Sequence, residues 1–163
     1  MTTKVVALLE AHGVPYRLLP HDEPVFTVEA AARQRGVIKE EMVKSILLRE
    51  KAEPRRYVMA CVLGHMRLDP QAVRQALPGE WKRLTFASAE EILAVTGYVQ
   101  GAVNPLCLPP DVPVVFDEAI AACTKVNISS GDPLLGVELP AADLIRLADA
   151  ALAPIAEPGS DSG

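Results

Sequence analysis

The sequence contains few cysteines, and their arrangement excludes two classes of small protein. Only three are present in 163 residues, at Cys61, Cys107 and Cys123. They are odd in number, lie far apart and form no CxxC pair, so we expect neither a disulfide framework nor a tetrahedral zinc site. This pattern is typical of a protein of the reducing cytoplasm, which is the location we expect.

Long apolar runs are also missing. Hydrophobic residues make up 50% of the chain, yet no stretch approaches the roughly 18 continuous apolar residues of a membrane-spanning helix. The first residues, Met1 to Lys4, lead into an amphipathic pattern rather than the apolar core of a signal peptide. We therefore expect neither membrane insertion nor a membrane partner.

Several common catalytic motifs are absent as well. No GxGxxG or GxxxxGK[ST] follows a predicted strand, which disfavours a doubly wound nucleotide-binding fold. The sequence has no HExxH and no GxSxG, and its three histidines stand in unrelated contexts. We therefore expect no metal site, no cofactor and no Ser-His-Asp triad.

The charge of the chain is unevenly distributed. The formal net charge is −5, from 16 basic and 21 acidic residues. Nine basic and four acidic residues fall between Lys44 and Arg83, a local excess of +5, whereas the remainder has seven basic and 17 acidic residues, a net −10. A basic face of this kind could meet a few phosphates of a nucleic acid, and an ordinary scatter of surface charge explains the pattern equally well.

Helix signals recur along the chain. Apolar residues at helical spacing predict a first helix over residues 3–12, and capping residues followed by terminating glycines predict three more. These begin at Thr27, at Asp69-Pro70 and at the Ser88-Ala-Glu-Glu91 capping box, and end at Gly36, Gly79 and Gly97. A last amphipathic helix is predicted over residues 143–152.

Short segments rich in aliphatic and β-branched residues predict six strands, over residues 16–19, 42–48, 56–63, 112–116, 124–129 and 134–139. The second and third form a hairpin, and several connections are too short for parallel crossovers. The expected fold is α/β of the α+β type, with a mixed, mostly antiparallel, curved and barrel-like sheet and helices packed outside it. We expect one domain over residues 1–152 and a disordered tail over residues 153–163.

Four places could carry chemistry. Lys44 is a cation in an otherwise apolar strand, and a lysine that extends to the sheet edge is the simpler interpretation. The loop Gly97-Tyr-Val-Gln-Gly101-Ala-Val-Asn104-Pro105 and the turn Ser129-Ser-Gly131-Asp-Pro could approach a ligand with backbone N–H groups and hydroxyls, although both are also ordinary turns. The loop at His21-Asp22 could simply lead into the second helix.

Taken in order, these segments resemble the YbaK family. The first helix, the His21-Asp22 loop, the strand Val43-Lys44-Ser45-Ile-Leu, the GYVQGAVNP loop at residues 97–105 and VNISSG at residues 126–131 carry the resemblance, which spans about residues 3–152. Members are aminoacyl-tRNA editing domains related to the insertion domain of bacterial prolyl-tRNA synthetases. The resemblance implies a compact, barrel-like α/β domain that hydrolyses the ester between a wrong amino acid and the 3′ end of a tRNA.

The resemblance also implies roles for individual residues. Lys44 matches the essential lysine of the family, and Ser129 would be a second catalytic residue that orients the attacking water or a group on the substrate itself. Ser45, Gly101, Asn104 and Gly131 would bind substrate, with Ser45 in place of a common Thr and Asn104 in place of a common Ser. Lys44 would hold the terminal phosphate or the acyl carbonyl, and N–H groups near Gly101 would receive the developing oxyanion.

The implied partner is aminoacyl-tRNA, with an aminoacyl-tRNA synthetase as a possible second partner and no DNA. Two other functions stay open from the residues alone. The chain could be a non-catalytic accessory that binds tRNA or a synthetase, or it could be a small-molecule aminoacyl esterase.

Overall fold

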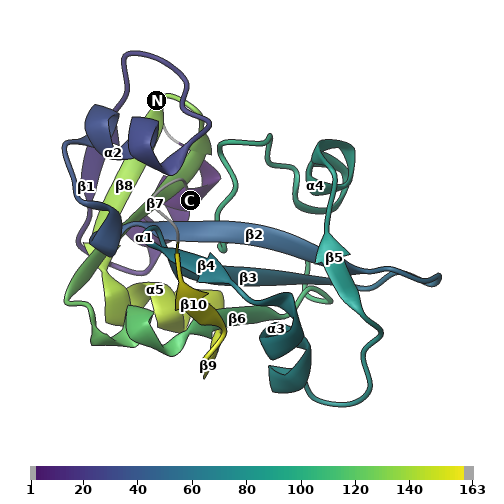
Figure 1. Cartoon of the computed structure of the whole chain (residues 1–163). Helices are drawn as coiled ribbons and strands as arrows, with labels where there is room; N and C mark the ends of the chain where they lie inside the picture. The colour runs from purple at the N-terminus through teal and green to yellow at the C-terminus, as the bar shows by residue number, and fades with distance from the viewer. Residues whose placement is uncertain (1–2, 160–163) are drawn as a thin grey trace.

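The computed structural model describes residues 3–159 and contains three separate sheets (Figure 1). The largest has five strands in the order β5-β2-β3-β6-β9. Its strands are β2 (Val43–Glu50), β3 (Tyr57–Leu63), β5 (Leu84–Phe86), β6 (Val114–Asp117) and β9 (Ala151–Ala153). Strand β2 pairs antiparallel with β3 and β5, whereas β6 pairs parallel with β3 and β9.

The two smaller sheets are wholly antiparallel. One has the order β1-β8-β7 and the other pairs β10 with β4. Their strands are β1 (Arg17–Pro20), β7 (Lys125–Asp132), β8 (Leu135–Pro140), β4 (Met66–Leu68) and β10 (Ala156–Pro158). The predicted mixed, mostly antiparallel α+β fold is therefore confirmed, but the sheets stay open and do not close into a barrel.

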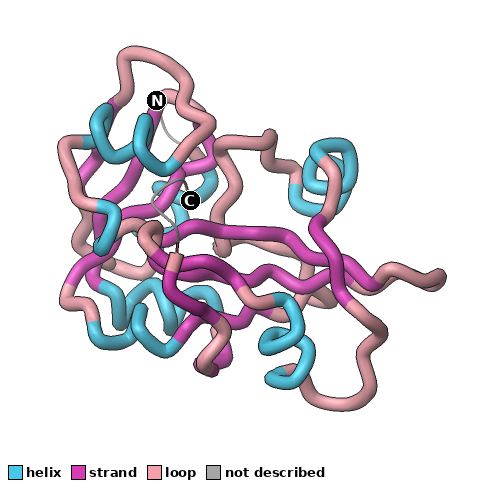
Figure 2. The backbone as a smooth tube through the Cα atoms, in the orientation of Figure 1, coloured by secondary structure: helices cyan, strands magenta, loops and turns pink. Residues whose placement is uncertain are grey.

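The helices lie around the outside of the strands, as Figure 2 shows. They are α1 (Lys4–Ala11), α2 (Val28–Arg35), α3 (Pro70–Ala76), α4 (Ala89–Thr96) and α5 (Ala141–Ala148), with short 3-10 turns η1 (Lys39–Glu41) and η2 (Glu118–Ala122). The predicted caps form: the side chains of Thr27 and Asp69 accept backbone N–H bonds, and the capping box at Ser88 and Glu91 is complete. None of the helices within residues 3–159 is long and apolar enough to cross a membrane.

Two apolar clusters cover the two faces of the five-stranded sheet. Successive residues of β3 alternate between them: Met59 and Cys61 belong to the cluster that packs under α1 and α5, whereas Val58 and Ala60 belong to the cluster under α3. Every one of these side chains is buried, as expected for a strand covered on both faces. Burial raises the pKa of the Cys61 thiol to about 12, so this cysteine is a small buried hydrophobe.

The expected disordered tail is wrong for residues 153–159. The carboxylate of Asp117 at the end of β6 accepts the N–H groups of Ile155 at 2.9 Å and Ala156 at 3.0 Å, and Ile155 is fully buried. These bonds act together with the pairing of β9 with β6 and of β10 with β4, so a segment rich in Ala and Pro is ordered by contacts that the sequence pattern did not show. The rest of the predicted tail, residues 160–163, lies outside the described residues.

A second buried acid fixes the far end of the β2–β3 hairpin. The carboxylate of Glu50, which is fully buried, accepts bonds from the backbone N–H and guanidinium of Arg56 and from the N–H of Lys82 at 2.7 Å. The Arg56 side chain is the main cause that lowers the pKa of Glu50 to about 2, with the Lys82 and Arg56 N–H groups assisting against the opposing effect of burial. Because Lys82 leads directly into β5, this carboxylate ties β5 to the hairpin.

Replacing Glu50 should destabilise the protein in a pH-dependent way. The folded pKa of about 2 lies below the ordinary value of 4.5, so the stabilisation is complete above pH 4.5 and is lost as the pH falls toward 2. We expect Glu50→Gln to lower the free energy of unfolding by about 1–3 kcal/mol at pH 7, with a smaller difference from wild type at each lower pH. Urea unfolding between pH 7 and pH 2 measures this.

The matched control is Glu80→Gln, an exposed acid on the adjacent loop. Its free energy of unfolding should follow that of wild type at every pH. A deficit in Glu50→Gln that stays constant down to pH 2 would contradict the linkage.

Candidate functional site

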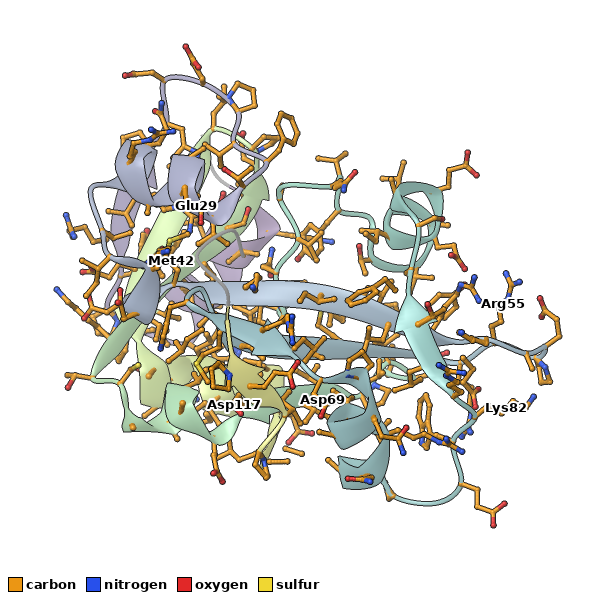
Figure 3. The ribbon with its side chains drawn as sticks, in the orientation of Figure 1. Glu29, Met42, Arg55, Asp69, Lys82 and Asp117 are labelled. Atoms are coloured by element: carbon orange, nitrogen blue, oxygen red, sulfur yellow. The ribbon has the colours of Figure 1, made fainter. Side chains whose placement is uncertain are left out.

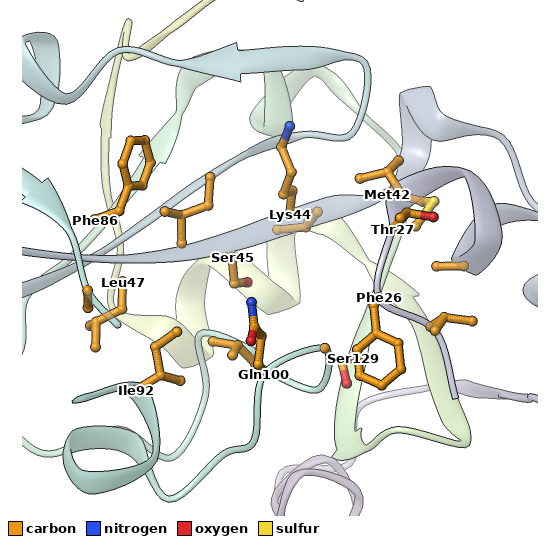
Figure 4. Close-up of a pocket in the computed structure, with 18 of the residues that line it drawn as sticks. Phe26, Thr27, Met42, Lys44, Ser45, Leu47, Phe86, Ile92, Gln100 and Ser129 are labelled. Carbon is orange, nitrogen blue, oxygen red and sulfur yellow. The ribbon is translucent and has the colours of Figure 1, made fainter. Parts of the chain in front are cut away.

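A cavity of about 290 Å³ lies along the open edge of β2 (Figure 4). Strand β5 pairs only with Leu48–Glu50, so the outer edge of the preceding β2 residues has no neighbouring strand from this sheet. The cavity occupies this gap. Its walls come from β2, the segment before α2 and α2 itself, the end of β5, α4, the loop after α4, and β7. The lining residues are Val25, Phe26, Thr27, Val28, Ala31, Arg35, Met42, Val43, Lys44, Ser45, Ile46, Leu47, Phe86, Ala87, Ile92, Gln100, Gly101, Val103 and Ser129.

Four of the six predicted site residues line this cavity: Lys44, Ser45, Gly101 and Ser129. They come from β2, from the loop after α4 and from β7, so the topology brings together three segments that are distant in sequence. The structure thus places the predicted lysine strand, glycine loop and serine turn around one space.

Lys44 is half-buried, and its ammonium donates a hydrogen bond to the carbonyl of Met66 at 2.8 Å. Burial lowers the pKa of this ammonium, and the carboxylate of Glu29 opposes that shift. Figure 4 shows the Lys44 side chain leaving β2 on the side opposite to Ser45, as strand alternation requires. One of the three ammonium N–H donors is used by Met66, and two remain for a ligand.

The hydroxyls of Ser45 and Ser129 lie on the other side of β2, near Gln100 (Figure 4). Ser45 accepts a weak bond from the thiol of Cys61 at 3.4 Å, and Ser129 accepts the N–H of Gly131 at 3.4 Å. The carbonyl of Leu47 accepts the N–H of Ala87, so backbone alternation directs the N–H and C=O of Ser45 to the same open edge. This side of the cavity therefore offers neutral hydrogen-bonding groups.

Gly101 packs tightly against the segment before α2. Its φ is +90°, and a Cβ there would lie 2.8 Å from the carbonyl oxygen of Val25 and 3.0 Å from the ring of Phe26. A side chain at this position is excluded both by backbone conformation and by contact. Glycine therefore allows the loop after α4 to close one wall of the cavity.

The other two predicted residues, Asn104 and Gly131, do not line the cavity, so the expectation that they contact substrate is not supported by their position. Asn104 is fully buried, and its side-chain carbonyl accepts the N–H of Leu106 at 2.9 Å. A Cβ at Gly131 would lie 3.0 Å from the ring of Tyr98. Both residues pack the loop after α4 against β7, which explains why turn-forming residue types occupy them.

Several cavity residues were not predicted from the sequence. Phe26 and Phe86 are exposed aromatics at the two ends of the cavity, with 74% and 57% of their surface accessible. In the sequence, Phe26 only precedes a helix cap and Phe86 only ends a three-residue strand, so neither carries a signal. Arg35 and Gln100 were also missed, because an arginine in a helix and a glutamine in a loop are ordinary surface residues.

The cavity lining is mostly apolar, and its polar side chains are cationic, hydroxyl or amide groups. The residues that line it include Lys44 and Arg35 but no carboxylate, histidine or cysteine. Within residues 3–159, no group of three His, Cys, Asp or Glu side chains lies close enough to bind a metal ion. Such a site can bind an anionic or ester-bearing ligand and stabilise developing negative charge.

Fold and site together define an α+β domain with a ligand cavity at an open strand edge. The family model of the aminoacyl-tRNA editing domain matches residues 22–147, more than half of the chain. The chain therefore belongs to the aminoacyl-tRNA editing domain family, and the resemblance found in the sequence is confirmed.

Three comparisons illustrate this membership. The chain is 23% identical over 94% of its length, and 92% of the relative, to a protein of Enterococcus faecalis described as a candidate Cys-tRNA(Pro)/Cys-tRNA(Cys) deacylase. It is 26% identical to the multifunctional Ser/Thr-tRNA deacylase ProXp-y of Escherichia coli, over 89% of this chain and 86% of that one. A crystal structure described as a candidate trans-editing enzyme for prolyl-tRNA synthetase superposes with a TM-score of 0.76 at 25% identity, covering 94% of this chain and 95% of that one.

Replacing Gly101 should destabilise the protein more than replacing a glycine that has a similar φ but no close neighbours. Gly79 has φ +79°, and a Cβ added there would have nothing within 4 Å, whereas one at Gly101 would also meet Val25 and Phe26. We expect Gly79→Ala to lower the free energy of unfolding by about 1 kcal/mol and Gly101→Ala by about 2–4 kcal/mol. Urea unfolding of both variants measures the difference, and equal losses would show that the close approach to Val25 and Phe26 is unimportant.

Proposed function

We propose that this protein is a trans-editing hydrolase that deacylates mis-acylated, prolyl-tRNA-related aminoacyl-tRNA. The observation that carries the proposal is that Lys44, Gly101 and Ser129 line one cavity in a member of the editing family. The relatives described as tRNA deacylases support the substrate class. Its partner is the 3′ end of aminoacyl-tRNA, with a synthetase as a further partner, and its place of action is the cytoplasm.

The reaction needs little acid–base machinery, because an aminoacyl ester is already activated. Water adds to the ester carbonyl, the bond from that carbon to the ribose oxygen breaks, and the products are the free amino acid and a tRNA with its hydroxyl restored. Positioning and stabilisation of the negative charge on the carbonyl oxygen supply the rate gain. In this proposal backbone N–H groups near Gly101 receive that charge, and the Ser129 hydroxyl orients the water.

Lys44 supplies the fixed positive charge. Its ammonium leaves β2 on the side opposite to Ser45 (Figure 4), so it contacts the part of the substrate that passes over the strand edge. That part is a phosphate or the acyl oxygen, both of which carry or develop negative charge. The bond to Met66 holds the ammonium in place before substrate arrives.

Deacylation assays test the proposal directly. Purified protein should cleave one preferred substrate among tRNAs charged with Ala, Cys, Ser, Thr or Pro. Lys44→Ala should lower kcat/KM by about 100-fold or more, because a charged group that acts in the transition state is removed. Lys125→Ala, which removes an exposed lysine paired with Glu138, is the matched control and should keep full activity.

Three results would overturn this function. Intact tRNAs under conditions in which a control editing domain cleaves them would exclude catalysis. Binding that Lys44→Ala weakens without any turnover in wild type would indicate an accessory protein. Free aminoacyl esters cleaved as well as the tRNA-linked form would indicate a small-molecule esterase.

The end of the β2–β3 hairpin is the surface that we propose for the body of the tRNA. Exposed basic residues gather there, and Figure 3 shows Arg55 and Lys82 at this end. The set is Lys51, Arg55, Arg56, Lys82 and Arg83. Glu50 in the same region is buried and pairs with Arg56, and the exposed acids Glu53 and Glu80 lie nearby, so five basic and three acidic residues leave a net charge of +2.

Removing two of these charges should weaken binding in a salt-dependent way. We expect the double variant Lys82→Ala/Arg83→Ala to raise KM for aminoacyl-tRNA with kcat retained, and to reduce the slope of log affinity against log salt by about 1 for each phosphate that is no longer bound. The control is Arg17→Ala/Lys125→Ala, which removes two basic residues that pair with Glu138. An unchanged salt slope in the Lys82/Arg83 variant would exclude this surface.

A further inference from the structure

Arg35 is a cation for which the proposed function has so far given no role. It is the last residue of α2 and reaches across to β7 and to the loop after β1. Its Nε donates to Nε2 of His21 at 3.1 Å, and its Nη1 donates to Oδ1 of Asn127 at 2.8 Å. The guanidinium lies over Gly136, where any Cβ would collide with it. The fold therefore makes room for this side chain at the cavity wall.

The partners of Arg35 within the protein are neutral. Nδ1 of His21 is 2.9 Å from the carbonyl of Pro133 and must carry a proton to bond it, so the nitrogen that accepts from Arg35 is the unprotonated one. Burial lowers the pKa of His21, and the charge of Arg35 adds to this effect, whereas the hydrogen bond to the carbonyl of Pro133 and the charge of Asp132 oppose it. None of the ion pairs within residues 3–159 includes Arg35. Burial lowers the pKa of Arg35 to about 10, so the group stays protonated at neutral pH with no compensating carboxylate.

The rest of the guanidinium is open to the cavity. Nη2 of Arg35 donates no hydrogen bond within the described residues. If it were also buried, it would be a buried polar atom without a partner, but among the described residues the one such side-chain atom is Nδ2 of Asn104. Nη2 is therefore accessible, and Arg35 is part of the cavity lining. A planar guanidinium that is held on one side by neutral acceptors and open on the other is suited to bind an oxyanion through two parallel bonds.

The two ends of the cavity differ in chemistry. Arg35 lines the cavity from the end of α2. In Figure 4, Thr27, which caps α2, lies with Met42 at one end of the cavity, whereas Leu47 and Ile92 lie at the other. An aminoacylated RNA end carries anionic phosphodiesters on its RNA side and a cationic α-ammonium on its amino-acid side. A cation at one end attracts the first and repels the second.

We propose that Arg35 binds the phosphate of the 3′-terminal nucleotide, so that the RNA lies at the α2 end of the cavity and the aminoacyl group at the α4 end. This proposal rests on the proposed function for the identity of the ligand. It assigns Arg35 as a substrate-binding residue that orients the ester along the edge of β2.

Adenosine 5′-monophosphate and adenosine are the probes, because they differ only in the phosphate in question. We expect wild type to bind the monophosphate about tenfold or more tightly than adenosine, as judged by NMR titration. Arg35→Gln should reduce this preference by about tenfold or more and leave adenosine affinity unchanged. Arg33→Gln, which removes the same charge from an exposed position of the same helix, should behave as wild type.

Two further variants separate binding from folding. Arg35→Lys keeps the charge and should retain part of the preference, and Asn127→Ala removes one protein bond while leaving the guanidinium. If Arg35 is merely structural, Arg35→Gln and Asn127→Ala will lower the melting temperature alike while the phosphate preference of the folded protein stays at the wild-type value, and the proposal fails. Absence of a preference in wild type also overturns it.

The binding assay does not depend on hydrolysis, so it distinguishes the two proposals. A protein that discriminates the phosphate through Arg35 but cleaves no aminoacyl-tRNA would refute the enzyme and keep the site. An active enzyme whose Arg35→Gln variant keeps both the phosphate preference and the wild-type KM would refute the site and keep the enzyme.

Discussion

The cavity depends on the incomplete pairing of one strand. Strand β2 is paired with β3 along almost its whole length, but β5 covers only its last three residues. An unpaired strand edge exposes backbone donors and acceptors, which in many proteins must be protected from other chains. Here α2, α4 and the loop after α4 surround the edge without pairing with it. The backbone groups that could pair with another chain at an uncovered edge thus face a ligand cavity.

Two buried carboxylates hold the elements that border this edge. Glu50 in the hairpin accepts a hydrogen bond from the N–H of Lys82, just before β5. It therefore positions β5, and the cavity residues Phe86 and Ala87 lie at the end of this strand. Asp117 accepts a hydrogen bond from the segment between β9 and β10, and β10 pairs with β4. The carbonyl of Met66, the first residue of β4, accepts the hydrogen bond from the Lys44 ammonium. Neither acid lines the cavity, yet each fixes an element from which a cavity residue or its partner comes. Structural and functional groups are therefore linked through backbone hydrogen bonds.

Most of the fold could be predicted from the sequence, because four of the five helices in residues 3–159 carry side-chain caps and the longer strands are rich in aliphatic residues. The strands that were missed, β4, β5, β9 and β10, have three residues each, too few to show a period. The first two residues of β9 were also assigned to the end of the helix predicted over residues 143–152, which in the structure ends at Ala148. The order of residues 153–159 was missed for another reason: it comes from contacts with distant segments, namely the carboxylate of Asp117 and the strands β4 and β6. For the site, the family resemblance identified Lys44, Ser45, Gly101 and Ser129, whereas it could not separate residues that line the cavity from Asn104 and Gly131, which support its wall.

Arg35 shows why some functional residues escape sequence reasoning altogether. Its importance comes from what surrounds it in space, namely neutral partners, the lack of a paired carboxylate and an opening to the cavity. The same geometry constrains the chemistry. Both ring nitrogens of His21 are engaged, one by Arg35 and one by Pro133, so this imidazole cannot act as a general base while the network is intact. With no carboxylate among the lining residues, the groups available for hydrolysis of an activated aminoacyl ester are fixed positive charge, backbone N–H groups and hydroxyls.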